Sequence, residues 1–308
     1  MSQYLVRRLI LAVPVIVGVS IAVFLMMHLI PGDPALAMLR GQPTVTQADI
    51  ERVRHQLGLD DPIPVQYLKY VGRVLHGDFG ESVHSHRPVL EMIGEQAWAT
   101  VQLALAAMLI AVALGITLGT ISAIRQNSWV DTLSMLVALF GVSMPSFWFG
   151  LLLIYIFALR LGWFPITGQG GLQRLVLPAV ALGMDFSAIT ARLVRSNLLE
   201  VLRQDYILSA RAKGLQDRRV ISRHALRNAM IPVLTIIGLQ LGNLLGGAVV
   251  IETVFAREGI GRLAITAILS KDFPLVQGIV LLSAIVYVGV NLAVDLTYAL
   301  FDPRIHYA

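Results

Sequence analysis

The stretch that decides the fold runs from Leu175 to Ala191 and reads LVLPAVALGMDFSAITA. Its 17 residues are fewer than the about 20 that a helix needs to cross the hydrocarbon core of a bilayer. Asp185 also interrupts the apolar run. A short buried helix is therefore the alternative to a membrane span, and the rest of the chain has to decide between the two.

Composition favours the membrane. The 308 residues are 56% hydrophobic and 14% charged, whereas a soluble domain carries about 25% charged residues. Such a chain has too little polar surface to cover itself in water. Cysteine is absent, which excludes disulfides and cysteine-based zinc, iron–sulfur or redox sites.

Five further windows contain no Asp, Glu, Lys or Arg, and each holds at least 22 residues. These windows are 9–32, 96–124, 132–159, 228–251 and 273–294. Each is long enough to span a bilayer. The first is predicted to be an anchor and not a cleaved signal peptide, because its apolar run is too long and no small-residue cleavage site follows it.

Loop charge decides the sixth span. If residues 175–191 cross the membrane, then segments 1–8, 125–131, 192–228 and 300–308 share one side and carry 13 Lys and Arg against five acids. The segments on the other side carry 11 Lys and Arg against 12 acids. Cytoplasmic loops are enriched in Lys and Arg, so the sequence predicts an all-α polytopic membrane protein with six transmembrane helices and both termini in the cytoplasm. The net charge of +5 then belongs to the inner loops and not to a nucleic-acid surface.

This topology divides the chain into a cytoplasmic N-terminus (1–8), a first transmembrane helix (9–30), an extracytoplasmic cap (31–97) and a membrane core (98–308). The core segments are transmembrane helices near 98–124, 132–159, 175–195, 229–251 and 275–297, with a cytoplasmic segment at 196–228. Pro145 is expected to kink the second of these helices.

The cap is predicted to be helical. Thr46-Gln47-Ala48-Asp49 resembles a capping box before a helix that Gly58 would end. Pro64 and Gly77 bound a second, amphipathic run, and Pro88 opens a third. The expected apolar face of the second run comprises Tyr67, Leu68, Val71, Val74 and Leu75.

Small residues recur every four positions in two of the spans. The two series are Ala111, Gly115, Gly119 and Ala123, and Gly238, Gly242 and Gly246. Such stripes let helix backbones approach closely in lipid. Close helix packing is therefore predicted along both stripes.

Polar residues within spans usually face a cavity or a partner helix. Asp185, Gln240 and Asn243 are the candidates for a translocation path. For Asp185, a role in the path and a helix–helix hydrogen bond remain equal alternatives.

Catalytic and metal-binding motifs are missing. The sequence has no G-x-x-x-x-G-K-[ST] phosphate loop and no H-E-x-x-H zinc motif. His76, His84 and His86 lie near one another, but no Cys or carboxylate stands at ligand spacing. No catalytic residue, metal or cofactor is predicted on this chain.

The cytoplasmic segment is dense in cations but also holds small residues and a central glycine. A helix held to anionic lipid headgroups is one explanation. Ala210, Ala212, Gly214 and Leu215 fit better the close docking of another protein.

This segment resembles the "EAA loop" of permease subunits of binding-protein-dependent ABC importers. The matching residues are Ala210-Arg211-Ala212-Lys213-Gly214-Leu215 and Arg223-His224-Ala225-Leu226-Arg227-Asn228-Ala229. Leu208-Ser209-Ala210 stand where the general pattern has Glu-Ala-Ala, and Arg227 stands where it often has Pro.

Further motifs resemble signatures of the dipeptide and oligopeptide type of such permeases, specifically the first of their two paired subunits. They are Leu29-Ile30-Pro31-Gly32-Asp33-Pro34, Gly77-Asp78-Phe79-Gly80-Glu81-Ser82, Leu199-Glu200-Val201-Leu202 before Asp205-Tyr206, Glu252-Thr253-Val254-Phe255 followed by Gly259-Ile260-Gly261-Arg262-Leu263, and Asp302-Pro303-Arg304-Ile305. Together and in this order they cover nearly the whole chain.

The resemblance implies half of a translocation path in the bacterial inner membrane. It implies a second homologous permease, two ATPase subunits or domains that bind ATP and Mg, a solute-binding protein outside, and contact with membrane lipid but not nucleic acid. The residues implied to contact the ATPase are Ala210, Ala212, Lys213, Gly214, Leu215, Arg218 and Arg223. The alternative is a self-sufficient channel or secondary transporter that uses Asp185 and the polar residues Gln240 and Asn243 of the fifth span. The sequence leaves the substrate open among dipeptides, oligopeptides, glutathione, nickel and other solutes.

Overall fold

The structure is a computed structural model and describes residues 2–29, 34–39 and 46–301. Over these residues the chain is helical and contains no β-strand. Contacts divide the chain into two compact units, one made of residues 1–98 and 259–308 and the other of residues 99–258. This division follows contacts and not the sides of a membrane, so the predicted topological segments remain predictions.

Five helical stretches are long and apolar enough to cross a membrane: Arg8–His28, Val89–Ile124, Gln173–Leu202, Asp217–Val254 and Phe273–Val294. A sixth crossing exists if the bent pair Trp129–Ser143 and Ser146–Arg160 is one span. Many large apolar side chains on these helices are exposed, for example Ile10, Leu109 and Leu136. The chain is thus a polytopic all-α membrane protein, because such surface is stable only against lipid or another subunit.

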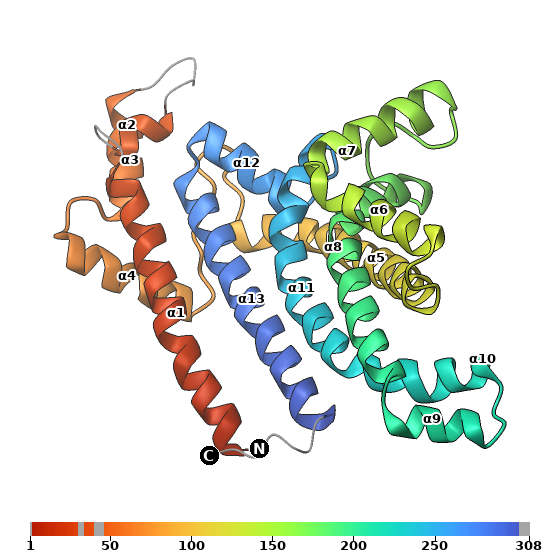
Figure 1. Ribbon diagram of the computed structural model, residues 1–308. Helices are drawn as coiled ribbons and strands as arrows, with labels where there is room; N and C mark the ends of the chain where they lie inside the picture. Colours follow the sequence, from red (N-terminus) through yellow and green to blue (C-terminus); the bar gives the residue numbers. More distant parts are fainter. Residues whose placement is uncertain (1, 30–33, 40–45, 302–308) are drawn as a thin grey trace. The chain divides into compact units, whose positions relative to one another are not determined.

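The first unit is built on α1 (Ser2–His28) and α13 (Phe273–Phe301), which lie side by side (Figure 1). α2 (Pro34–Leu39), α3 (Gln47–Leu57) and α4 (Ile63–Leu75) follow α1, and α12 (Ile260–Ser270) precedes α13. α5 (Val89–Ile124) begins in this unit and continues into the other.

The helix boundaries predicted for the segment after α1 are confirmed. The Thr46 side chain accepts a hydrogen bond from the Asp49 amide, and the Asp49 carboxylate accepts one from the Thr46 amide. α3 ends at Gly58, which is in the left-handed region at φ 65°. α4 stops just before Gly77, and α5 starts directly after Pro88.

The apolar face expected for α4 is partly wrong. Leu68 and Leu75 are 69% and 79% exposed. The face that packs on α1 includes the predicted Tyr67 and also Tyr70, whose rings lie 5.4 and 5.9 Å from the ring of Phe24.

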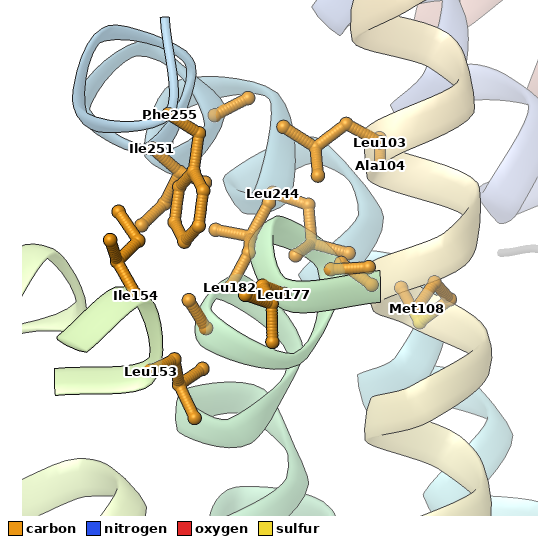
Figure 2. Close-up of a cluster of buried hydrophobic side chains, with 14 of the residues drawn as sticks. Leu103, Ala104, Met108, Leu153, Ile154, Leu177, Leu182, Leu244, Ile251 and Phe255 are labelled. Atoms are coloured by element: carbon orange, nitrogen blue, oxygen red, sulfur yellow. The ribbon is translucent and has the colours of Figure 1, made fainter. Parts of the chain in front are cut away.

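The second unit is organised around α8 (Gln173–Leu202), the helix that contains the stretch 175–191. α6 (Trp129–Ser143), α7 (Ser146–Leu153) and α11 (Leu226–Val254) all pack against it. Figure 2 shows the resulting core, in which Leu177 and Leu182 of α8 lie among side chains of neighbouring helices. In the most apolar 18-residue window of α8, 56% of the window is buried inside the structure. The corresponding value for Arg8–His28 is 17%. This span is weakly hydrophobic because it faces protein more than lipid.

The small-residue stripe of α5 packs on α8 as predicted. A methyl group added at Gly119 would lie 2.5 Å from the carbonyl oxygen of Ala191, and one at Gly115 would lie 2.5 Å from Cβ of Thr190. Only a glycine allows the two backbones to approach so closely. The stripe of α11 differs, since Gly242 is buried but Gly246 is exposed with no atom within 4 Å of an added methyl group.

Pro145 breaks its helix more sharply than the kink that the sequence predicts. α6 and α7 meet at an angle of 106°. Met144 has φ −109° and ψ 137°, an extended conformation that the ring of a following proline favours. α7 then continues as a π-helical segment, η1 (Ile154–Arg160). The expected single helix over 132–159 is therefore two helices joined by an extended residue.

Candidate functional site

The cytoplasmic segment predicted at 196–228 contains a helical hairpin, here called the 203–225 hairpin. α8 ends at Leu202, and α9 (Asp205–Ala212), α10 (Asp217–Arg219) and the π-helical η2 (Val220–Ala225) follow before α11 begins. Figure 1 shows α9 and α10 beyond the ends of α8 and α11.

A small apolar core holds the hairpin on the helices that carry it. Its fully buried residues are Ala123, Leu198, Ile207, Val220, Ala225 and Ala229. The Asn228 side chain also donates a hydrogen bond to the Tyr206 hydroxyl at 2.8 Å. Because α5, α8, α9, η2 and α11 all contribute to these contacts, the hairpin is packed on the ends of three long helices.

Gly214 shapes the turn of the hairpin. Its φ of 79° lies in the left-handed region, which side chains with a Cβ adopt at a cost. The Leu215 amide donates to the Ala210 carbonyl at 3.3 Å, and the Gly214 amide donates to the Arg211 carbonyl at 2.9 Å. This pair of bonds is a Schellman motif, which satisfies the last carbonyls of a helix. The small residues and the glycine that suggested a docking site thus have a structural role at the end of α9.

The structure sorts the seven predicted docking residues into two groups. Ala210 and Leu215 are partly buried and pack on the apolar core of the hairpin. The exposed group comprises Ala212, Lys213, Gly214, Arg218 and Arg223. This second group makes up the exposed part of the predicted docking surface.

An ion pair that sequence reasoning missed ties the α5–α6 turn to α8. Asp131 accepts two hydrogen bonds from Arg195, at 2.9 Å from Nε and 2.8 Å from Nη2. The same carboxylate accepts from the Ser122 hydroxyl and from the Asn127 amide. Asp131 and Arg195 are 64 residues apart, so no local pattern could reveal the pair. It lies at the end of the second unit that carries the hairpin, three residues before Leu198 of the hairpin core.

A second buried polar cluster joins the end of α11 to α5. Glu252 and Arg257 are 0% and 2% exposed. The Thr100 hydroxyl donates to Glu252 at 2.6 Å, and Arg257 donates to the Gln102 side chain at 3.0 Å and to the Ala99 carbonyl at 3.3 Å. The Glu252 motif noted in the sequence therefore sits at a helix-to-helix anchor.

The three residues predicted for a translocation path differ in burial. Gln240 is buried between α8 and α11, where its side-chain oxygen accepts a hydrogen bond from Thr190 at 3.3 Å. Its side-chain nitrogen has no hydrogen-bond partner among the residues that the structure describes. Asn243 is exposed on α11, and Asp185 is half-buried on α8. Gln240 thus takes part in a hydrogen bond between two helices. For Asp185, such a bond was the alternative to a role in the path.

Two family models match the chain. Residues 1–106 match the N-terminal membrane component of binding-protein-dependent transport systems, and residues 115–307 match the inner membrane component of such systems. The motifs at 29–34 and 302–305 fall within these matches, although residues 30–33 and 302–305 lie outside those that the structure describes.

Curated relatives match over the full length of both chains. The dipeptide transport system permease protein DppB of Alkalihalophilus pseudofirmus is 43% identical over 335 residues. The glutathione transport system permease protein GsiC of Escherichia coli K12 is 42% identical over 307 residues. Both alignments cover 100% of this chain and 100% of the relative.

Solved structures share the fold. An inward-facing form of the MetNI methionine ABC transporter superposes with a TM-score of 0.60 at 16% identity, covering 68% of this chain and 96% of that chain. An amino acid ABC transporter crystallised with histidines gives a TM-score of 0.52 at 17% identity, covering 70% and 95%. With the family models, these similarities show that the chain belongs to the inner membrane components of binding-protein-dependent transport systems and is a transmembrane permease subunit of an ABC importer.

Proposed function

We propose that this chain forms half of a translocation path for peptides or similar small solutes in the bacterial cytoplasmic membrane. A second homologous permease completes the path, and a solute-binding protein delivers substrate from outside. Two ATPase subunits or domains bind ATP and Mg on the cytoplasmic side. This chain itself is not catalytic, since ATP hydrolysis takes place on those partners.

The observation that carries the proposal is the division of the 203–225 hairpin into a packed interior and an exposed surface. The interior ties the hairpin to α5, α8 and α11. The surface offers one small residue and several cations: Ala212, Lys213, Arg218 and Arg223. A small residue between cations lets an acidic groove of a partner approach closely. Movement of that partner would reorient the long helices together, a transition between two packed states.

Gly214 is a poor site for testing the docking surface, because its left-handed backbone disfavours any other residue. Ala212 is better suited, since it is exposed and helical. Ala212→Glu adds a bulky side chain of opposite charge without disturbing the turn. Ala48, an exposed residue of α3, provides the matched control Ala48→Glu.

The assay uses the assembled transporter in proteoliposomes with its ATPase partners and binding protein, and measures substrate uptake and ATP hydrolysis. We expect Ala212→Glu to lower uptake per ATP at least tenfold, and Ala48→Glu to match the wild type. Equal uptake by both variants contradicts the docking assignment. Uptake by this chain in liposomes without ATPase partners contradicts the importer mechanism and favours the self-sufficient transporter.

A further inference from the structure

A histidine at the end of α1 faces more hydrogen-bond acceptors than a neutral imidazole can satisfy. The Nδ1 atom of His28 lies 3.3 Å from the Phe24 carbonyl oxygen, and its Nε2 atom lies 3.1 Å from the side-chain oxygen of Gln66. A neutral ring carries one N–H group, whereas the imidazolium ring carries two. The number of protons that the ring needs therefore depends on which atom of Gln66 points toward it.

The other partners of Gln66 fix the orientation of its amide. Gln66 is only 6% exposed, and its side-chain nitrogen donates to the Asp61 carbonyl at 2.7 Å and to the Leu59 carbonyl at 3.3 Å. If the amide were turned over, its oxygen would face two carbonyl oxygens, which cannot donate. The amide oxygen therefore points at His28, and Nε2 of His28 donates to it.

The second ring nitrogen also faces an acceptor, because the Phe24 carbonyl oxygen cannot donate. When Nε2 carries the only proton, the lone pair of Nδ1 is turned toward this oxygen. The imidazolium ring donates to both acceptors, and hydrogen bonds from a charged donor are about twice as strong as neutral ones. Protonation of His28 thus completes a chain of hydrogen bonds from the 59–61 turn, through Gln66, to the last turn of α1.

The ring of His28 is held in place and is still open to protons. It lies 4.9 Å from the ring of Phe24 and is partly buried. Together with Gln66 it lines a cavity of about 530 Å³ between the end of α1, the end of α3 and the start of α4. All of these residues belong to the first unit, so the arrangement does not depend on how the two units are placed.

The charges around the ring are of both signs. Arg54 of α3 and the acids Asp60 and Asp61 of the following turn line the same cavity. Asp61 is paired with Lys69 of α4 at 2.5 Å. Asp272, at the start of the neighbouring α13, is bonded to the loop before α5. The phenols that α4 packs on the Phe24 ring are Tyr67 and Tyr70. The hydrogen-bond geometry of the ring, and not an excess of one charge, is therefore what distinguishes its two protonation states.

We propose that His28 is a pH-sensitive joint between α1 and α4, which tightens when the ring is protonated and loosens when the ring loses its second proton. The contact is therefore stabilised as the pH falls and weakened as the pH rises. In the predicted topology α4 belongs to the extracytoplasmic cap, so the joint responds to acidity on the outer side of the membrane. An effect on transport rests on the proposed function, whereas the response of the joint itself does not.

The test is amide hydrogen exchange of the assembled transporter in nanodiscs without ATP. Exchange is compared at about pH 5 and about pH 8, the range in which histidine changes its charge, and an unstructured reference peptide corrects for the intrinsic effect of pH. We expect α4 to be about fivefold more protected at the lower pH, because the charged donor makes the stronger hydrogen bonds. Protection of α4 that is equal at both pH values, or greater at the higher pH, overturns the proposal.

Two variants assign the response to His28. His28→Gln removes the titrating group, and His28→Phe keeps a ring against Phe24 but has no nitrogen, so in both the protection of α4 should no longer depend on pH. The matched control is His76→Gln, because His76 follows α4 and has a single acceptor, the Gly72 carbonyl at 2.8 Å, among the described residues. This control should keep the fivefold response.

A response that persists in His28→Phe, or one that disappears in His76→Gln, overturns the assignment. Failure of the importer mechanism would appear instead in the ATP-driven uptake assay, which the exchange measurement does not use.

Discussion

The ion pair between Asp131 and Arg195 should be a main support of the end of the molecule that carries the hairpin. The two side chains share two hydrogen bonds, at 2.9 and 2.8 Å, and are 8% and 30% exposed. The perturbation is a double-mutant cycle of Asp131→Asn, Arg195→Gln and the combined variant, which isolates the energy of the pair from the separate effects of each change.

The expected magnitude follows from burial and from the remaining partners. Removing one partner of a buried pair costs about 3–5 kcal/mol, because the other charge is left uncompensated. Asp131 keeps its bonds from Ser122 and Asn127 after Arg195→Gln, and the arginine side chain is partly solvated. We therefore expect Arg195→Gln to lower the free energy of unfolding by about 2 kcal/mol, with a coupling energy of about 1–2 kcal/mol.

The control is the pair Arg211–Asp217 in the same unit. Its nitrogen–oxygen distance is 3.0 Å, close to that of the buried pair, but the side chains are 42% and 72% exposed. The cycle Arg211→Gln with Asp217→Asn should give a coupling energy of about 0–0.5 kcal/mol, as for other surface pairs.

The assay is reversible unfolding of the purified protein in mixed detergent micelles, followed by the fluorescence of its four tryptophans. Coupling energies that are the same in both cycles would refute the reasoning, since burial would then contribute nothing. A cost for Arg195→Gln that persists in the Asp131→Asn background would show that the arginine acts through other contacts.

Three further perturbations have defined outcomes. Gly119→Ala should destabilise the protein by about 1–2 kcal/mol through overpacking against α8, whereas Gly94→Ala in the same helix, with no atom within 4 Å of the added methyl group, should be neutral or stabilising in the same unfolding assay. Thr46→Ala removes the cap of α3 and should speed amide hydrogen exchange in its first turn about fivefold, the equivalent of about 1 kcal/mol; unchanged exchange would contradict the capping role. The chain has no cysteine of its own, so Asp185→Cys introduces a single thiol. If residue 185 faces the path, this thiol should react with a water-soluble thiol reagent in at least one transport state, whereas the control Ala188→Cys, at a position that is 1% exposed, should stay protected. Protection of both thiols would favour helix packing.

Local sequence signals predicted much of what the structure contains. The helix ends predicted near Gly58 and Gly77 follow from the backbone freedom of glycine, which acts within one turn of the chain. The cations and small residues before α11 predicted a docking segment in the region that forms the helical hairpin. Even so, the sequence could not tell which of those residues are exposed, because Ala210 and Ala212 differ only in the direction of their side chains.

Contacts between distant residues needed the structure. Gln240 and Asn243 are both polar residues of one span, but the first is buried against α8 and the second is exposed. The pair Asp131–Arg195 joins residues 64 positions apart and has no sequence signature at all. Such features depend on which helix faces which, and a window of consecutive residues holds no information on that.

By itself, the sequence determined that the chain resides in a membrane and where its long apolar segments lie, since the length and apolarity of a span are local sums over consecutive residues. The stretch 175–191 shows where that information ends. Its marginal hydrophobicity allowed two readings, and loop charge favoured a span. Only the tertiary structure gave the reason: α8 is packed on three other helices, so neighbouring side chains, and not lipid, solvate most of its surface. The two buried charge clusters likewise arise from packing between elements far apart in the chain.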